Sequence, residues 1–240
     1  MSKYVIVLAG GSGQRMGRDE NKVFLPLGGV PAIVRAVVPF SALCDGAVVV
    51  ARERERQDME DLLRGYGLSR MVCAVVCGGE DRQASVAAGL SALPEDAGIV
   101  LIHDGARALV TEDVIRRVMA SAECRGTGVA AMPVTDTIKR ARMGGQVDET
   151  LPRDGLYAIQ TPQGFLLEQL KKAHQYADET GYRGTDDASL LEHAGLPVYL
   201  CRGDAENIKL TTPEDVALAG MILTRREERK SSVQEAFAPD

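Results

Sequence analysis

The sequence has no apolar run that approaches the roughly 20 residues needed to cross a membrane. It also has no basic segment followed by an apolar core at its start, because it goes straight into "KYVIVLAGG". We therefore expect neither membrane insertion nor export, and we predict a cytoplasmic protein.

Histidine is scarce, and cysteine is scattered. The chain has 3 histidines and 5 cysteines, and an odd, widely spaced set of cysteines favours reduced thiols over disulfides. Cys73 and Cys77 are close in sequence but have no histidine nearby, so a zinc site is not expected there.

Excess positive charge is also missing. The net charge of −6 argues against a general nucleic-acid-binding or anionic-membrane-binding surface. A polyanionic ligand must therefore be bound by a local group of cations. The 240 residues contain no internal repeat and no clear linker, which favours a single domain spanning residues 1–240.

Short apolar runs alternate with segments of helical length. This alternation is typical of a parallel sheet covered on both faces, and it predicts an α/β, mostly parallel, doubly wound sheet. The predicted strands are 4–9, 46–51, 70–76, 98–103 and 126–132, then "LYAIQ" and "PVYLC"; the predicted helices are 31–43, 53–65, 81–93, 112–124, 164–178, 186–194 and one from Pro213. Ligands of such sheets lie at the carboxyl ends of the strands, where the loops 9–22, 77–85 and 103–108 should meet.

Residues 134–156 interrupt this alternation. They read as two extended segments around Gly144 and Gly145, a strong hairpin signal. An isolated two-stranded ribbon is only marginally stable, so we expect this arm to pack on a second subunit; an unpartnered surface hairpin is the alternative. The tail 228–240 is expected to be frayed.

The segment "VLAGGSGQRMG", residues 7–17, resembles a phosphate-binding loop. Met16 breaks the dinucleotide-binding glycine pattern, and Arg18 after Gly17 breaks the P-loop pattern. Arg15 and Lys22 follow the glycines, and cations beside backbone N–H groups suit a triphosphate. Solvated surface charge is the interpretation for Arg18.

Two more segments bring charge to the same edge. "LIHDGAR" places Asp104 and Arg107 at the end of a buried strand, where a carboxylate can hold Mg²⁺ against phosphate oxygens. His103 is interpreted as a packing residue. Lys209 in "NIKLTTPED" should lie close by. No nucleophile–base pair is evident, so the predicted chemistry is positioning and charge neutralisation, as phosphoryl or nucleotidyl transfer requires.

These residues resemble the 2-C-methyl-D-erythritol 4-phosphate cytidylyltransferase family. The matching segments are "LAGGSGQRMG", "GGEDRQASV", "VLIHDGAR", "PVTDTIKRA", "RDGLYAIQTPQGF", "TDDASLLE" and "GDAENIKLTTPEDVALA". The resemblance implies a Rossmann-like nucleotidyltransferase fold, a homodimer that exchanges its arms, and Mg²⁺ or another divalent cation as cofactor. It also implies CTP as co-substrate and a sugar-alcohol phosphate as acceptor, with pyrophosphate released in isoprenoid precursor synthesis.

The resemblance also assigns roles to residues. Arg15, Lys22 and Lys209 are the implied catalytic residues, and Asp104 is the implied metal ligand. The implied nucleotide-binding residues are Ala9, Gly10, Gly11, Ser12, Gly13, Gly79, Glu80, Ser85, Asp104 and Gly105. Arg107, Thr137, Arg153 and Thr185 are implied to bind the acceptor, with Thr137 and Arg153 supplied by the opposite subunit.

Three positions depart from the family's usual pattern. Asn21 and Ala108 stand where proline is usual, and Ala84 stands where an acidic residue is common; these changes are expected to loosen loops or alter sugar affinity. A ribitol-5-phosphate cytidylyltransferase is the nearest alternative, and a non-catalytic nucleotide-binding regulator is another. A nicotinamide-dependent reductase is disfavoured, because Glu53 is poorly placed to bind a ribose.

Overall fold

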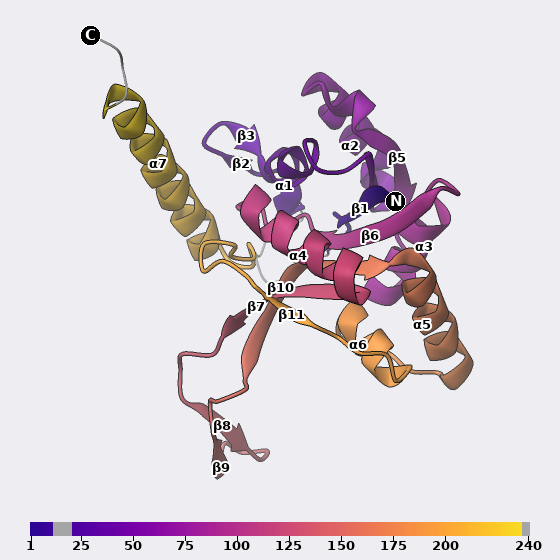
Figure 1. Ribbon diagram of the computed structural model, residues 1–240. Helices are drawn as coiled ribbons and strands as arrows, with labels where there is room; N and C mark the ends of the chain where they lie inside the picture. The colour runs from indigo at the N-terminus through magenta and orange to yellow at the C-terminus, as the bar shows by residue number, and fades with distance from the viewer. Residues whose placement is uncertain (12–20, 237–240) are drawn as a thin grey trace.

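A seven-stranded sheet forms the centre of the protein. The computed structural model describes the backbone of residues 1–11 and 21–236 and side chains as far as residue 229, so Ser12, Gly13 and Arg15 lie outside the described residues. The strand order is β11-β7-β10-β6-β1-β4-β5 (Figure 1). The strands are β1 (Ser2–Leu8), β4 (Gly46–Ala51), β5 (Val72–Cys77), β6 (Ala97–Asp104), β7 (Thr127–Pro133), β10 (Tyr157–Leu166) and β11 (Leu200–Arg202).

The sheet is parallel except for one strand. β10 pairs antiparallel with both β6 and β7, whereas β1, β4, β5, β6 and the pair β7–β11 have parallel neighbours. The central strands are apolar along their whole length because both faces of the sheet are covered. The mostly parallel α/β fold is confirmed.

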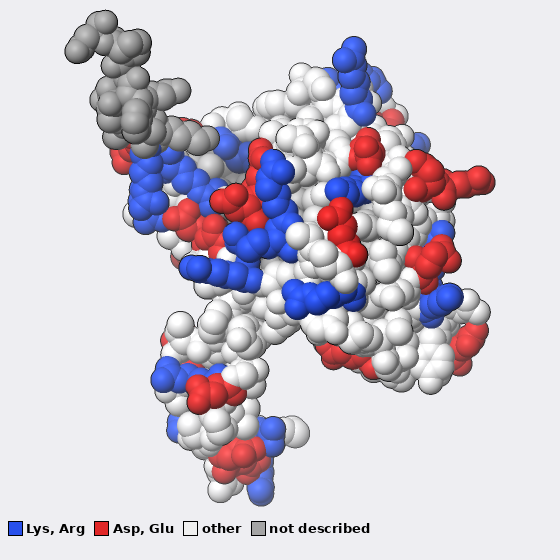
Figure 2. Space-filling model, in the orientation of Figure 1, with Lys and Arg blue, Asp and Glu red and all other residues white. Residues whose placement is uncertain are grey.

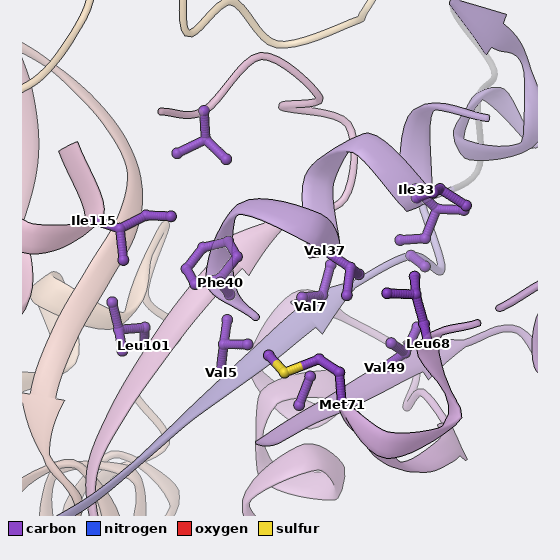
Figure 3. Close-up of a cluster of buried hydrophobic side chains, with 14 of the residues drawn as sticks. Val5, Val7, Ile33, Val37, Phe40, Val49, Leu68, Met71, Leu101 and Ile115 are labelled. Carbon is purple, nitrogen blue, oxygen red and sulfur yellow. The ribbon is translucent and has the colours of Figure 1, made fainter. Parts of the chain in front are cut away.

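Alternating side chains of β1 separate the core into two layers. Val5 and Val7 pack into one cluster with Phe40, whereas Ile6 packs into the other with Leu170. Figure 3 shows Val5, Val7 and Phe40 in the first cluster. The first layer contains residues of α1 (Ala32–Val37), α2 (Arg56–Gly65) and α4 (Glu112–Arg125); the second contains residues of α3 (Arg82–Ser91), α5 (Leu167–Thr180) and α6 (Asp187–His193).

The predicted helix bounds differ from the observed ones by a few residues, most clearly in two helices. The predicted helix 31–43 is α-helical only to Val37 and continues as the 3-10 helix η3 (Val38–Phe40). Pro39 explains the change, because it has no N–H to donate to the preceding turn. The helix predicted from residue 164 begins at Leu167, since β10 continues to Leu166 in register with β6.

Short elements connect the main ones. Between β1 and β4 lie a 3-10 helix and a two-stranded hairpin, and further 3-10 helices precede α2 and β5. They are η2 (Lys22–Phe24), β2 (Pro26–Leu27), β3 (Val30–Pro31), η4 (Glu53–Glu55) and η5 (Leu68–Arg70).

Helix α7 (Pro213–Ala236) projects away from the sheet (Figure 1). It extends past residue 228, where the tail was expected to begin. Thr212 and Asp215 begin it with reciprocal hydrogen bonds: the Thr212 N–H donates to Asp215 Oδ2 at 2.8 Å, and the Asp215 N–H donates to Thr212 Oγ1 at 3.4 Å. Within the described part of the chain, α7 and the other helices are too short or too polar to cross a membrane.

The arm is the hairpin of β8 (Ile138–Ala141) and β9 (Val147–Leu151), which protrudes from the other side of the molecule (Figure 1). Gly144 and Gly145 turn it with φ of 89° and 83°, values that favour glycine. Residues 139–150 are all exposed, and the strands are joined by the ion pair of Arg140 with Glu149. Figure 2 shows blue and red side chains next to one another on the arm. The arm therefore has no core of its own.

Candidate active site

A cavity of about 580 Å³ lies at the carboxyl ends of the parallel strands. It is lined by the loop after β1, the loop after β5, the end of β6 and the segment before α7. The predicted meeting of loops is therefore confirmed. Of the predicted site residues, Gly10, Gly11, Lys22, Gly79, Glu80, Ser85, Asp104 and Lys209 line this cavity.

Two predicted nucleotide-binding residues lie behind the cavity lining. Ala9 is fully buried, and its N–H donates to the Val50 carbonyl at 2.7 Å. The Gly105 N–H donates to the Leu8 carbonyl at 2.9 Å. A Cβ on Gly105 would meet that carbonyl oxygen at 3.0 Å, so glycine allows β6 to leave the sheet closely packed against β1.

The turn before α3 holds Gly79 and Ser85 together. The Gly79 N–H donates to Ser85 Oγ at 3.2 Å, and Ser85 Oγ donates to the Asp81 carbonyl at 2.8 Å. Asp81 caps α3 by accepting from the Ala84 N–H at 2.7 Å. A Cβ on Gly79 would lie 2.4 Å from that of Ala84, so the two small residues pack directly against one another.

Asp104 is surrounded by cations. Its carboxylate lies 2.7 Å from Lys209 Nζ and 4.0 Å from both Arg82 Nε and Arg107 Nε. Burial alone would raise the pKa of Asp104, but Lys209, followed by Arg82 and Arg107, holds it below its ordinary value. Asp104 is therefore ionised at neutral pH, and the cations gathered around it can also bind an anionic ligand.

Lys22 lies near the start of α7. Burial raises the pKa of Asp215, but hydrogen bonds from Thr212 and Thr211, together with the charge of Lys22, bring it below its ordinary value. Thr211, Lys22 and Lys209 all line the cavity. The structure thus brings two of the three predicted catalytic residues to one wall.

Sequence reasoning missed Arg82 and its partner Asp187. Arg82 Nη1 lies 2.7 Å from Asp187 Oδ2, and Asp187 is fully buried in the first turn of α6, where His174 Nε2 lies 3.5 Å from its other oxygen. Both residues stand inside segments that matched the family, "GGEDRQASV" and "TDDASLLE". The signal that could have identified them is a charged residue at the start of a helix that follows a sheet-edge loop.

A second cavity of about 450 Å³ adjoins the first. Arg82, Asp104 and Lys209 line both cavities, and the predicted acceptor ligands Arg107 and Thr185 line the second. The guanidinium of Arg107 is held by the Asn207 carbonyl at 2.6 Å, so its place beside Asp104 is fixed.

The other predicted acceptor ligands lie on the arm. Thr137 is exposed, and Arg153 donates to the Thr135 carbonyl at the base of the arm. Arg153 lines a separate cavity formed by residues 133–135 and 153–157 and is absent from the lining of the two cavities at Asp104. This chain therefore does not bring its own Arg153 to its own Arg107.

His103 lies inside the protein and is fully buried against Phe40. Its Nδ1 lies 3.1 Å from Thr161 Oγ1, which accepts from the Asp104 N–H at 3.0 Å, and its Nε2 lies 3.2 Å from the Arg107 carbonyl. Burial lowers the pKa of His103 to about 4. A neutral imidazole thus positions the turn that carries Asp104 and Arg107.

Two of the three departures from the family pattern prove to be well packed. Asn21 is 2 % exposed, and its amide donates to the Ala9 carbonyl at 2.6 Å and to Glu55 Oε2 at 2.7 Å. Ala108 is 5 % exposed in the apolar cluster beneath α7. The Asn21 side chain thus ties the end of β1 to η4, and the loop 12–20 that it was expected to loosen lies outside the described residues.

Comparison with known proteins gives a consistent result. The model of the IspD family, 2-C-methyl-D-erythritol 4-phosphate cytidylyltransferase, matches residues 3–225. Proteins of that name from Halalkalibacterium halodurans and Geobacillus kaustophilus are 45% and 46% identical to the chain, over 95% and 94% of its length and 100% and 99% of theirs.

Solved structures agree with these sequence matches. The crystal structure of 4-diphosphocytidyl-2C-methyl-D-erythritol synthase from Anaerococcus prevotii has a TM-score of 0.80 at 27% identity, covering 93% of this chain and 98% of that one. The Thermus thermophilus 2-C-methyl-D-erythritol 4-phosphate cytidylyltransferase has a TM-score of 0.75 at 32% identity, covering 92% and 98%.

Proposed function

Because the chain belongs to the 2-C-methyl-D-erythritol 4-phosphate cytidylyltransferase family, we propose that its two adjoining cavities bind the two substrates of that reaction. The protein is a nucleotidyltransferase that transfers the CMP moiety of CTP to 2-C-methyl-D-erythritol 4-phosphate in isoprenoid synthesis. The observation that carries the assignment of substrates to cavities is the sharing of Arg82, Asp104 and Lys209 between them.

CTP occupies the larger cavity in this proposal. Gly10 and Gly11 leave room for phosphates at one end, and the turn of Gly79 and Ser85 offers backbone and hydroxyl groups to the base and ribose at the other. The sugar phosphate occupies the second cavity, where Arg107 and Thr185 bind its phosphate group.

The chemical step needs no general base. An oxygen of the acceptor phosphate, already anionic at neutral pH, attacks the α-phosphorus of CTP, and the bond to the β-phosphate oxygen breaks to release pyrophosphate. Negative charge grows on the α-phosphoryl oxygens and on the leaving group. Lys22 and Lys209 are placed to stabilise this charge, and Arg82 and Arg107 hold the substrates in line.

A divalent cation such as Mg²⁺ fits the donor set around Asp104. Mg²⁺ in nucleotide sites is held by one or two carboxylates together with substrate phosphates, and Asp104 supplies one hard oxygen ligand at the junction of the cavities. Among the described residues, no three His, Cys, Asp or Glu side chains group into a protein-only metal site. When bound, the ion neutralises phosphate charge; Asp104 holds it.

We propose that the arm completes the acceptor site of a second subunit. Residues 139–150 are exposed in their own chain, and Arg153 lines neither of the cavities at Asp104. Exposed Tyr157, Ile159 and Leu200 offer apolar surface on the strands beside the arm. A homodimer would cover this surface and supply Thr137 and Arg153 to the partner. The cytoplasmic location stays a prediction.

The substrates are tested by measuring pyrophosphate release with CTP, UTP, ATP and GTP, each offered with methylerythritol phosphate or ribitol 5-phosphate. We expect CTP with methylerythritol phosphate to give the highest kcat/KM, because a wrong base leaves buried polar groups unpaired. Faster turnover with ribitol 5-phosphate would favour the alternative acceptor. Nucleotide binding without pyrophosphate release would indicate a non-catalytic regulator and would overturn the proposal.

A further inference from the structure

Arg52 holds the backbone of the two glycines that open the nucleotide cavity. It follows β4 directly, and its Nε donates to the Gly10 carbonyl at 3.1 Å while its Nη2 donates to the Gly11 carbonyl. A trans peptide points its N–H opposite to its carbonyl, so the Gly11 N–H faces away from Arg52. Among the described residues, neither the Gly10 nor the Gly11 N–H has an acceptor, and both glycines line the cavity.

Glu55 connects Arg52 to Asn21. Its Oε1 accepts from Arg52 Nη1 at 3.0 Å, and its Oε2 accepts from Asn21 Nδ2 at 2.7 Å. The side chains of Arg52 and Glu55 are only 17% and 12% exposed, so these charge-assisted bonds are weakly screened. The Glu55 carboxylate therefore connects Arg52, which holds Gly10 and Gly11, to Asn21, which precedes Lys22.

Asn21 completes the connection. Besides Glu55, its Nδ2 donates to the Ala9 carbonyl at 2.6 Å, and its Oδ1 accepts from the Val23 N–H at 3.3 Å and so caps the short helix η2. This helix begins at Lys22. The buried side chain of Asn21 thus fixes the position of Lys22 relative to Ala9, the residue immediately before the two glycines.

We propose that Arg52, Glu55 and Asn21 act as a clamp that sets the glycine backbone and Lys22 in the geometry that binds the nucleotide phosphates. They are positioning residues that act through Gly10, Gly11 and Lys22. Arg52 and Glu55 do not line the cavity, and Asn21, which borders it, is only 2 % exposed. The clamp rests on the proposed function for the identity of the nucleotide. Because the clamp acts on the binding of the triphosphate, its effect can be measured as CTP affinity in the absence of catalytic turnover.

The test begins with Glu55→Gln and Asn21→Asp. Glu55→Gln keeps the shape but turns one acceptor into a donor, and Asn21→Asp places a second carboxylate beside Glu55. Each variant should weaken CTP binding, measured by calorimetry with Mg²⁺ present, by about tenfold, the effect of losing one charge-assisted bond. The KM for methylerythritol phosphate should change by less than about twofold, since the clamp does not reach the second cavity.

The double variant is the decisive one. When Asn21→Asp is combined with Glu55→Gln, the new amide at position 55 can donate to the new carboxylate at position 21 while its oxygen still accepts from Arg52. The link between positions 21 and 55 is restored with its polarity reversed, whereas the bond to the Ala9 carbonyl stays lost. The double variant should therefore bind CTP more tightly than Asn21→Asp alone but less tightly than the parent. A general loss of folding would not be repaired in this way. Thermal melting of all variants separates a loss of stability from a specific loss of CTP binding.

Two further variants serve as checks. Glu60→Gln breaks the neighbouring Arg56–Glu60 pair of 3.0 Å, which lies on α2 and does not contact the glycines, so CTP binding should stay at the parent value. Arg52→Lys keeps the charge beside Glu55 but cannot span both glycine carbonyls, so it should weaken CTP binding.

Three results would overturn the clamp: CTP affinity within twofold of the parent in both single variants, equal increases in KM for both substrates, or a double variant no better than Asn21→Asp. The proposed function fails differently. In that case the parent binds CTP but releases no pyrophosphate with methylerythritol phosphate, and the affinities of the variants still report on the clamp.

Discussion

Lys209 Nζ lies 2.7 Å from Asp104 Oδ2, at the junction of the two cavities. The pair joins the end of β6 to the segment before α7, and Arg82 and Arg107 approach the same carboxylate from α3 and from the turn after β6. This arrangement places one anion among three cations. Arg82 is also paired with Asp187, so Lys209 and Arg107 are the cations that share Asp104 and can pair with substrate phosphates.

Asp104→Asn should lower the affinity for Mg²⁺ while keeping the size of the side chain. The amide is neutral and a weaker ligand for a hard cation, so activity should fall and recover in part at high Mg²⁺. The measurement is a Mg²⁺ titration of pyrophosphate release for parent and variant. Identical titration curves would show that Asp104 does not bind the metal.

Lys22→Ala should reduce kcat with a smaller effect on CTP binding. If the ammonium acts on charge that develops in the transition state, its loss should cost about 2.7–4 kcal/mol, by analogy with a lost oxyanion donor. Steady-state kinetics and calorimetry with CTP separate the two effects. Lys171→Ala, on the exposed surface of α5, is the matched control and should leave kcat unchanged. If Lys22→Ala also left kcat unchanged, Lys22 would have no role in the chemical step.

The buried His103 should make stability depend on pH. Burial lowers its pKa from 6.5 to about 4, so the unfolded chain binds more protons than the folded one between these values. Stability is then fully present above about pH 6.5 and is lost as the pH falls toward 4, with a slope approaching about 1.4 kcal/mol per pH unit. Urea unfolding across this range measures the slope.

His103→Gln should flatten that part of the profile and also reduce stability at pH 7 by about 1–3 kcal/mol, because the hydrogen bonds with Thr161 and the Arg107 carbonyl are disturbed. An unchanged slope in His103→Gln would mean that other groups cause the pH dependence.

Hydrophobic patterning predicted the sheet because the strands are apolar along their length. The bounds predicted for the strand 46–51 match β4 residue for residue, since the charged residues Asp45 and Arg52 flank it. The end of α1 was missed where Pro39 changes the hydrogen-bond pattern within an apolar run. The length of β10 was underestimated, because this strand continues to Leu166, through residues whose pattern predicts the start of a helix.

The site residues that come directly after a buried strand could be predicted from the sequence. Asp104, Lys22 and the glycines each follow a buried strand or its loop, and topology alone brings such residues together. Arg82 and Asp187 were missed because their partnership spans two helices. The hydrogen bonds of Asn21 were not predicted, because one of its partners is Glu55, a residue 34 positions away that no local pattern connects to it.

Arg153→Ala should raise the KM for the sugar phosphate more than the KM for CTP, because it removes one cation from the acceptor's phosphate. If the arm acts on the partner subunit, mixing Arg153→Ala with Lys22→Ala should restore activity. In a mixed dimer, one site carries both lesions and the other carries none. The restored sites should show the parent's KM for the sugar phosphate.

Subunit exchange must be confirmed independently, for example by differential tagging and co-purification. When exchange has occurred and activity is still absent, each arm serves its own chain. A protein that stays monomeric at assay concentrations would lead to the same conclusion.

The central claim is that the junction at Asp104 transfers a nucleotidyl group from CTP to a phosphate acceptor. The most direct measurement follows labelled phosphorus from CTP into products in the presence of methylerythritol phosphate. Label in the α-phosphate should appear in the sugar product, and label in the γ-phosphate should appear only in pyrophosphate. Label from the γ-phosphate in the sugar product, or free CMP with no labelled sugar product, would contradict the account.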